Sequence, residues 1–175
     1  MKNAKTIWIW TMFLSIVLSS KLTLFQQEPQ AARVKPKALG LSVAGYTTKI
    51  HAVADAPGNP IDFILTEGQA SDVNQALPLL ELVPEVAQAF MADKAYDCNE
   101  VIEFVKKRKM IPVIPPKSNR VNPQTCDFVL YKERHLIECF FGKIKHYRRI
   151  FSRFEKKAKN YMGFLRFVSA LIWLR

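Results

Sequence analysis

The fold is decided by the stretch Tyr131-Lys-Glu-Arg-His-Leu-Ile-Glu-Cys-Phe-Phe-Gly-Lys-Ile-Lys145. On an α-helix, with about 100° of rotation per residue, one narrow arc of this stretch carries a phenol, two cations and a carboxylate. The residues of this charged arc are Tyr131, Arg134, Glu138 and Lys145. An apolar stripe lies on the opposite side and consists of Leu136, Ile137, Phe140, Ile144 and Tyr147. We therefore predict a helix that docks through the stripe; a bland surface helix would instead scatter its charges over the whole solvated face.

The spacing within the charged arc, Tyr-x2-Arg-x3-Glu-x6-Lys, resembles the signature of bacterial insertion-sequence transposases of the Asp-Asp-Glu type. These form the insertion-sequence-4 and -5 superfamily. The segment that follows, Ile144-Lys-His-Tyr-Arg-Arg-Ile150, is also similar to this family. The likeness extends over most of residues 38–175.

This resemblance implies a role for each residue of the arc. Glu138 would be the third metal-binding carboxylate of a catalytic triad, and Arg134 and Lys145 would face DNA phosphates. Tyr131 would stack on a base or position the DNA backbone, although packing at the start of a helix explains it equally well. The DNA-binding residues implied in this way are Tyr131, Arg134, Lys145, Arg148 and Arg149.

The second carboxylate of the triad is expected at Asp93. Residues 86–92 form a short apolar run that predicts a buried strand, and ligands bind at the carboxyl ends of strands in α/β sheets. The segment Asp93-Lys-Ala-Tyr-Asp97 resembles the second-carboxylate segment of the family, with Asp93 as the match. We expect Asp97 to cap the next helix, residues 99–109.

Two other polar residues invite a functional interpretation. His51 has no metal-ligating neighbour in the sequence, so a polar strand residue is the preferred interpretation. Asp72 is a candidate replacement for a missing carboxylate, but Ser71 or Asp72 is better explained as the N-cap of a helix over residues 73–83.

The first 25 residues do not fit the rest of the chain. Two lysines and an apolar run over residues 6–20 are typical of a signal peptide, but the run is too short to span a membrane comfortably. Degenerate codons permit a shifted frame that reads Asp-x-Val-Leu-Ile-Asp-Ser-Thr-Ile-Val-Lys-Ala-His-Pro. This shifted reading resembles the first catalytic strand of the family, and its Asp codon straddles Ser15 and Ile16. We interpret residues 1–30 as an out-of-frame segment and 38–175 as a truncated catalytic domain that lacks the first Asp; a signal-like segment remains the alternative.

The remaining patterns predict an α/β fold. Alternation and β-forming residues indicate strands at 45–54 and 61–65, and a proline-closed strand at 110–116 follows the helix over 99–109. A last helix is expected at 161–174, too short for a membrane span. The resemblance implies a ribonuclease-H-like core, similar to that of retroviral integrases, from which the first strand is missing.

Charge is distributed unevenly along the 175 residues, whose formal net charge is +11. Residues 1–105 contain 8 Lys and Arg against 11 Asp and Glu, whereas residues 106–175 contain 18 against 4. A basic half of this kind suits a polyanion such as DNA, although charge alone also fits solubility or an anionic membrane. Three cysteines without Cys-x-x-Cys spacing indicate reduced thiols in the cytoplasm: Cys98, Cys126 and Cys139.

Two functions compete on this evidence. The first is a transposase that cleaves double-stranded DNA at element ends and joins it to a target, with two Mg²⁺ ions held by Asp93, Glu138 and the missing Asp, and Mn²⁺ as a substitute. The second is a catalytically inactive remnant or regulator that only binds DNA. The partners expected are DNA, a second copy of the chain or the product of an upstream frame, and no membrane.

Overall fold

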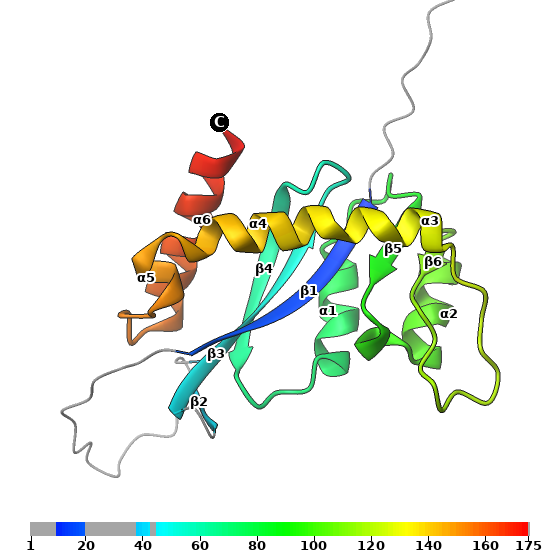
Figure 1. Cartoon of the computed structure of the whole chain (residues 1–175), viewed down its shortest axis with the longest axis horizontal. Helices are drawn as coiled ribbons and strands as arrows, with labels where there is room; N and C mark the ends of the chain where they lie inside the picture. Colours follow the sequence, from blue (N-terminus) through cyan, green and yellow to red (C-terminus); the bar gives the residue numbers. More distant parts are fainter. Residues whose placement is uncertain (1–9, 20–37, 43–44, 175) are drawn as a thin grey trace, which may run out of the picture.

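A computed structural model describes residues 10–19, 38–42 and 45–174 of the chain (Figure 1). The strands are β1 (Trp10–Ser19), β2 (Gly40–Ser42), β3 (Gly45–Ala54), β4 (Pro60–Glu67), β5 (Ala89–Ala92) and β6 (Ile111–Val113). The α-helices are α1 (Ala76–Glu81), α2 (Asn99–Lys107), α3 (Phe128–Tyr131), α4 (His135–Lys145), α5 (Arg148–Phe151) and α6 (Ala158–Trp173). Short 3-10 turns are η1 (Val73–Gln75), η2 (Lys94–Tyr96) and η3 (Lys132–Arg134). The predicted α/β class is confirmed.

The six strands form one mixed sheet. β3 pairs antiparallel with β1 on one side and with β2 and β4 on the other. β1 also pairs in parallel with β5, and β5 in parallel with β6. β1 therefore lies at the centre of the sheet, between an antiparallel half and a parallel half.

The prediction that the sheet lacks its first strand is wrong. Trp10–Ser19 occupies the central position, in register with Met12 opposite Ala54 on β3 and Phe13 beside Ala92 on β5. Strands pair through backbone N–H and C=O groups, so a segment of β-forming residues can fill this place whatever its side chains are. What the segment lacks is an acidic residue, because β1 contains neither Asp nor Glu.

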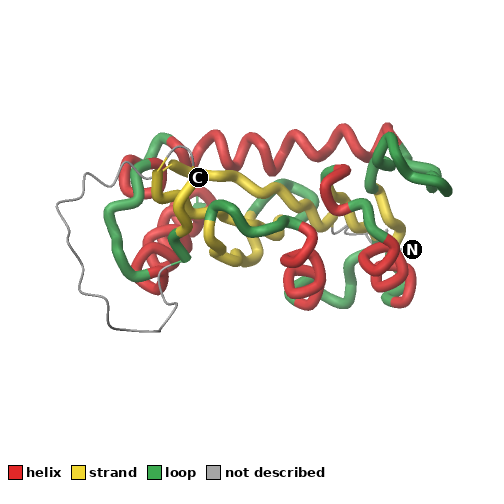
Figure 2. Tube along the Cα trace, turned by 90° about the horizontal axis from the view of Figure 1, so that it is seen from below, coloured by secondary structure: helices red, strands yellow, loops and turns green. Residues whose placement is uncertain are grey.

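Helices cover both faces of the sheet, and each face has its own core. Ile50, Ala52 and Ala54 of β3 face α4, α5 and α6, whereas Val53 faces α1 and α2. This alternation follows from the two-residue repeat of a strand. All four residues of β5 are buried, as expected for a strand covered on both sides. Figure 2 shows the long α4 along one side of the sheet and shorter helices on the other.

The helix predicted over 131–145 has the two faces expected of it, but the helical segment begins earlier than predicted. Asp127 accepts hydrogen bonds from the N–H groups of Val129 and Leu130, at 2.9 and 3.1 Å, so the helical segment begins at Phe128. The 3-10 turn η3 then leads into α4. Three residues of the predicted stripe are buried and two are partly buried: Ile137, Phe140 and Ile144, then Leu136 and Tyr147.

Asp72 does not cap a helix, contrary to expectation. Its side chain makes no capping hydrogen bond at η1 and instead pairs with the Lys49 ammonium at 2.9 Å. Lys49 reaches the Ala70 carbonyl as well, at 2.7 Å. A long-range ion pair between β3 and the segment after β4 therefore replaces the local contact that the sequence indicated.

None of the helices in the described part of the chain has the length and apolar character needed to cross a bilayer.

His51 is fully buried in β3. Its Nε2 lies 2.8 Å from the Thr66 hydroxyl, and its Nδ1 has no hydrogen-bond partner among the described residues. Burial lowers the pKa of His51 to about 4, with Asp72 opposing this shift and Lys49 adding to it. Within the described residues, no group of three His, Cys, Asp or Glu side chains could hold a metal ion. The geometry is that of a strand residue kept neutral.

We predict that His51 makes the fold sensitive to acid. The unfolded chain protonates His51 near pH 6.5 and the folded chain only near pH 4, so the His51 contribution is fully present above pH 6.5 and is lost as the pH falls to 4. The loss between pH 7.5 and 4.5 should be about 2 to 3 kcal/mol. Urea unfolding of the chain and of His51→Gln at both pH values measures it. Equal pH dependence of the two proteins would contradict the prediction.

We also predict that α4 is held by Phe140. This side chain is 2% exposed, and the centre of its ring lies 6.0 Å from the centre of the Phe63 ring on β4. Phe140→Ala should lower the free energy of unfolding by about 3 to 5 kcal/mol, because it leaves a cavity under the helix. Val129→Ala, at a 76% exposed position on α3, is the matched control and should cost less than about 0.5 kcal/mol. Similar losses in the two variants would show that α4 is not anchored this way.

Candidate functional site

Three residues of the charged arc form one cluster at the start of α4. Arg134 pairs with Glu138 at 2.5 Å, and its guanidinium lies over the Tyr131 ring, 5.5 Å from the ring centre. The four-residue spacing places the Arg134 and Glu138 side chains on successive turns of the helix. The Glu138 side chain is 46% exposed, so its carboxylate faces solvent.

Lys145 belongs to the same arc but lies apart from this cluster. It is exposed in the last turn of α4, and seven residues of helix separate it from Glu138 by about 10 Å along the axis. It forms no ion pair with any described residue. The arc therefore has a carboxylate end and a free cationic end.

Asp93 lies directly after β5, at the carboxyl end of the strand, where the sequence predicts it. It is partly buried, and its Oδ1 accepts a hydrogen bond of 2.6 Å from the Lys94 N–H. This local contact caps the turn η2 and fixes the carboxylate at the sheet edge.

The Tyr131 phenol is influenced by both predicted carboxylates, Asp93 and Glu138. Burial raises the pKa of the Tyr131 phenol, Arg134 opposes the shift, and the negative charges of Asp93, Cys126 and Glu138 raise the pKa further. Asp93 comes from a strand end and Glu138 from a helix, yet both act on the same phenol. Direct contacts thus join Tyr131, Arg134 and Glu138, and Asp93 adds an electrostatic effect on Tyr131.

This group of residues fits a divalent cation only in part. Carboxylate oxygens are the hard ligands that Mg²⁺ prefers, and the second oxygen of Asp93 makes no hydrogen bond with the described residues. One oxygen of Glu138 is engaged by Arg134, however. No group of three potential metal ligands occurs within residues 10–19, 38–42 and 45–174. The described residues therefore offer two carboxylates and no third ligand.

The predicted DNA-binding arginines after α4 take part in local packing. The Arg149 guanidinium pairs with Glu155 at 2.8 Å. It also lies over the Phe164 ring, 4.9 Å from the ring centre. Arg148 lies over the Phe154 ring at 5.5 Å. Both remain exposed, so these contacts orient their charges toward the surface.

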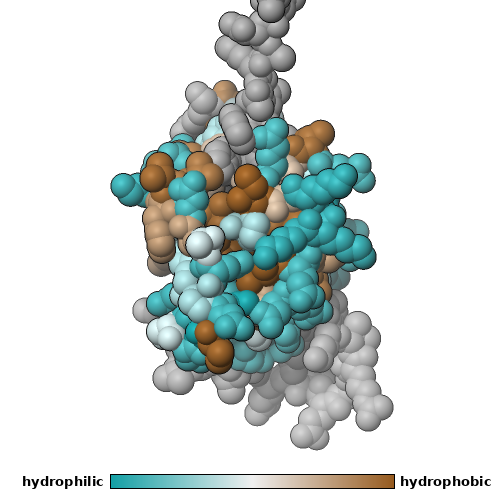
Figure 3. All heavy atoms as spheres, turned by 90° about the vertical axis from the view of Figure 1, so that its right-hand side faces the viewer, coloured by the Kyte–Doolittle hydropathy of each residue, from teal (hydrophilic) through white to brown (hydrophobic). Residues whose placement is uncertain are grey.

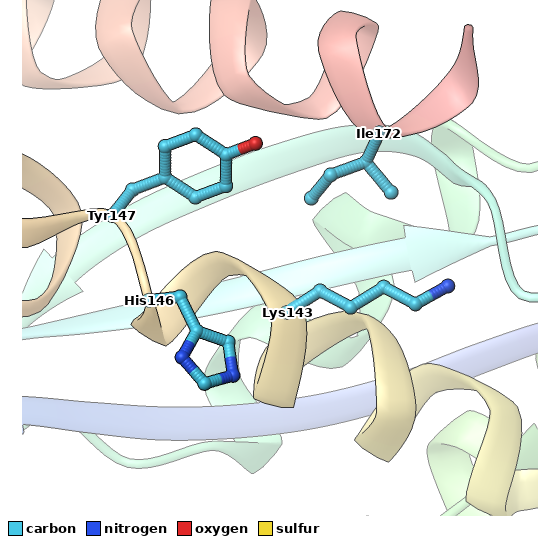
Figure 4. Close-up of a pocket in the computed structure, with 4 residues that line it drawn as sticks. All are labelled: Lys143, His146, Tyr147 and Ile172. Carbon is cyan, nitrogen blue, oxygen red and sulfur yellow. The ribbon is translucent and has the colours of Figure 1, made fainter. Parts of the chain in front are cut away.

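A cavity of about 610 Å³ lies between the end of α4 and α6. Lys143, His146 and Tyr147 line it from α4 and the residues after it, and Ile172 lines it from α6 (Figure 4). No acidic residue occurs from Cys139 to Phe154, so the segment that lines the cavity from α4 onward carries only neutral and basic side chains.

Sequence reasoning missed the role of Asp97. The predicted helix cap is wrong, because α2 begins after Cys98 and no side chain caps it. The Asp97 carboxylate is instead buried, accepts a 2.8 Å hydrogen bond from the Lys117 N–H and pairs with Arg120. These partners are 20 and 23 residues away in the chain, so no local pattern indicates them.

Comparison with known proteins identifies the family of the chain. The family model described as a transposase DDE domain matches residues 32–173. A candidate transposase for insertion sequence element IS6501 of Brucella ovis is 44% identical over 130 residues, covering 74% of this chain and 99% of the relative. A candidate transposase for insertion sequence element IS402 of Burkholderia cepacia is 30% identical over 135 residues, covering 71% of this chain and 62% of the relative. No solved structure matches the chain significantly. The chain belongs to the DDE transposase family of bacterial insertion sequences.

Proposed function

We propose that this chain binds double-stranded DNA as the catalytic-domain portion of an insertion-sequence transposase. The observation that carries the proposal is the placement of Asp93 at the carboxyl end of β5 and of Glu138 on α4, where Arg134 pairs with Glu138 and lies over the Tyr131 ring. A strand end and a helix face arranged in this way would give the two carboxylates a common site, with a cation next to it for a phosphate.

We propose further that the core is ribonuclease-H-like. The sheet order supports this, because an antiparallel half (β4, β3, β1) joins a parallel half (β1, β5, β6) with helices on both faces. The placement of Asp93 after β5 and of Glu138 on α4 supports it as well.

The residues of the arc suit different parts of DNA. A guanidinium can fork onto a phosphate with two hydrogen bonds, whereas an ammonium acts as a point charge, so Arg134 would orient a phosphate and Lys145 would attract one. Arg148 and Arg149 would extend this surface toward α5. Element ends and target DNA share these backbone contacts, because phosphate contacts position DNA without reading its sequence.

Members of this family use divalent metal ions, and Mg²⁺ bound at such a site stabilises the attacking and leaving oxygens of the phosphodiester. Asp93 and Glu138 would hold part of that site in this chain. Because the described residues contain no third ligand, no cleavage step is assigned to this polypeptide. The absence of an acidic residue from β1 favours the second candidate function, a DNA-binding remnant or regulator without cleavage activity.

The out-of-frame origin of residues 1–30 remains our proposal. The family match begins at residue 32, which supports it. The backbone register supports it too: Ser15 and Ile16, whose codons would contain the shifted Asp, pair with His51 and Ile50 on β3, and Phe13 lies beside Ala92, the residue before Asp93. A frame-corrected Asp would therefore enter β1 near the other two carboxylates.

We predict salt-sensitive DNA binding with weak sequence preference. For about three phosphate contacts, affinity for duplex DNA should fall about fortyfold between 50 and 200 mM salt, because each contact releases condensed counterions. Fluorescence anisotropy with two unrelated duplexes measures both properties. A flat response to salt would refute DNA binding by this surface.

The same assay locates the surface. The double variant Arg134→Ala, Lys145→Ala should weaken binding and lower the slope of log affinity against log salt by about two. The control, Lys156→Ala with Lys157→Ala, removes the same formal charge from exposed positions outside the arc and should change binding less. An equal loss in both variants would show that net charge, not the arc, determines affinity.

We predict that this chain alone does not nick or join DNA with Mg²⁺ or Mn²⁺, since two carboxylates are one short of the site. Correcting the frame so that the Ile-Asp-Ser-Thr segment replaces residues 10–25, with the preceding frame also supplied, should restore metal-dependent nicking of a supercoiled plasmid. The control is the corrected chain with Glu138→Gln. Robust nicking by the unmodified 175-residue chain would mean that another Asp completes the site.

A further inference from the structure

A buried ion pair ties two distant segments together at the end of the molecule that carries Asp93. The Asp97 side chain is fully buried, and its two oxygens contact the Lys117 N–H, at 2.8 Å, and the Arg120 guanidinium. Arg120 also donates to the Asn99 side chain and, through Nε, to the Asn122 carbonyl at 3.0 Å. We call Asp97 and Arg120 the clamp.

The clamp acts on a long connection. Residues 114–127, between β6 and α3, contain no helix or strand, and connections of this length are normally held by contacts of their own. Lys117, Arg120 and Asn122 all lie within it. Figure 3 faces this end of the molecule, where polar side chains dominate the visible surface.

The two sides of the clamp lead to the two carboxylates. Asp97 lies four residues after Asp93, at the end of the turn η2. The connection continues through Cys126 to Asp127, which starts the helical segment with Tyr131 and Glu138. Cys126 is half-buried and packs against the core beside Tyr131. The clamp is thus a buried polar contact between the segment that follows Asp93 and the segment that precedes Glu138.

We propose that Asp97 is a positioning residue, which through Arg120 fixes the 114–127 connection and so holds Tyr131 and Glu138 opposite Asp93. Asp97 is not itself the missing metal ligand, because a backbone N–H and a guanidinium already engage both of its oxygens. The role of Asp97 in positioning Glu138 for the site rests on the proposed function. Its role in fixing residues 114–127 rests only on the contacts described above.

Removal of either partner should release the connection locally. A buried Asp without its cation is costly, and so is a guanidinium that faces a neutral amide in place of a carboxylate. Arg120→Ala and Asp97→Asn should therefore open residues 114–127. Arg120→Lys keeps a cation for Asp97 and should restore most of the effect. The matched control is Arg108→Ala, since Arg108 ties the end of α2 to the Leu80 and Val83 carbonyls by a similar guanidinium contact.

The first measurement uses the native thiols. Alkylation by iodoacetamide, followed peptide by peptide, gives the rate at Cys126 relative to the exposed Cys139 on α4. Arg120→Ala should raise this ratio about tenfold, which corresponds to about 1.4 kcal/mol of lost local protection. Arg108→Ala should leave the ratio unchanged, even where it lowers thermal stability as much. This measurement requires neither metal nor DNA.

The second measurement is binding of Mn²⁺ to the full chain, followed by electron paramagnetic resonance of the free ion. Affinity should fall at least about fivefold in Arg120→Ala and in Asp97→Asn, recover in Arg120→Lys, and stay unchanged in Arg108→Ala. If Arg120 acted only on overall stability, Mn²⁺ affinity would also fall in Arg108→Ala, and it would not recover in Arg120→Lys.

The outcomes separate the two proposals. If the unmodified chain binds no Mn²⁺, the metal site of the proposed function fails, and the Cys126 ratio alone decides the clamp. If the ratio in Arg120→Ala changes no more than in Arg108→Ala, the clamp does not hold the connection and the inference is overturned.

Discussion

Everything at this site depends on the packing of one face of α4 against the sheet. Ile137, Phe140 and Ile144 are almost completely removed from water between α4 and the strands, and their burial fixes the rotation of the helix about its axis. Once that rotation is fixed, the Cα–Cβ bond of Glu138 points away from the core, because Glu138 lies on the opposite side of the same helix. The hydrophobic stripe therefore determines in which direction the Glu138 side chain leaves the helix, although it takes no part in any chemistry.

The polar contacts around the site then divide into two kinds. Arg134 and Glu138 pair where the Glu138 carboxylate is exposed and the Arg134 side chain is partly buried, so a cation or a phosphate can compete from the Glu138 side. Asp97 and Arg120 meet where the carboxylate is buried, and breaking such a pair leaves an uncompensated charge. The partly exposed pair suits a site that must exchange partners. The buried pair suits a part of the protein that must keep its shape.

The backbone and the side chains of β1 meet different requirements. Its N–H and C=O groups join the antiparallel and parallel halves of the sheet, and many sequences can meet that requirement. The proposed first carboxylate of the site would be a requirement on one side chain, and β1 contains neither Asp nor Glu. A frameshift within this segment would thus spare the strand and remove the chemistry, since β-forming apolar codons are common in either frame while an Asp at one position is not.

Features that depend on local periodicity and local contact could be predicted from the amino-acid pattern. The spacing of Tyr131, Arg134 and Glu138 predicted their common helix face, and the apolar run before Asp93 predicted its strand end, because a helix and a strand each repeat within a few residues. Local reasoning failed for Asp72 and Asp97, both expected to cap helices; their partners, Lys49 and Arg120, lie more than 20 residues away. It failed for β1 as well: the first strand was expected to be missing, but residues 10–19 pair with β3 and β5. Only the tertiary structure decided these contacts, because long-range ion pairs and strand pairing depend on which segments meet in space, and no spacing along the chain records that.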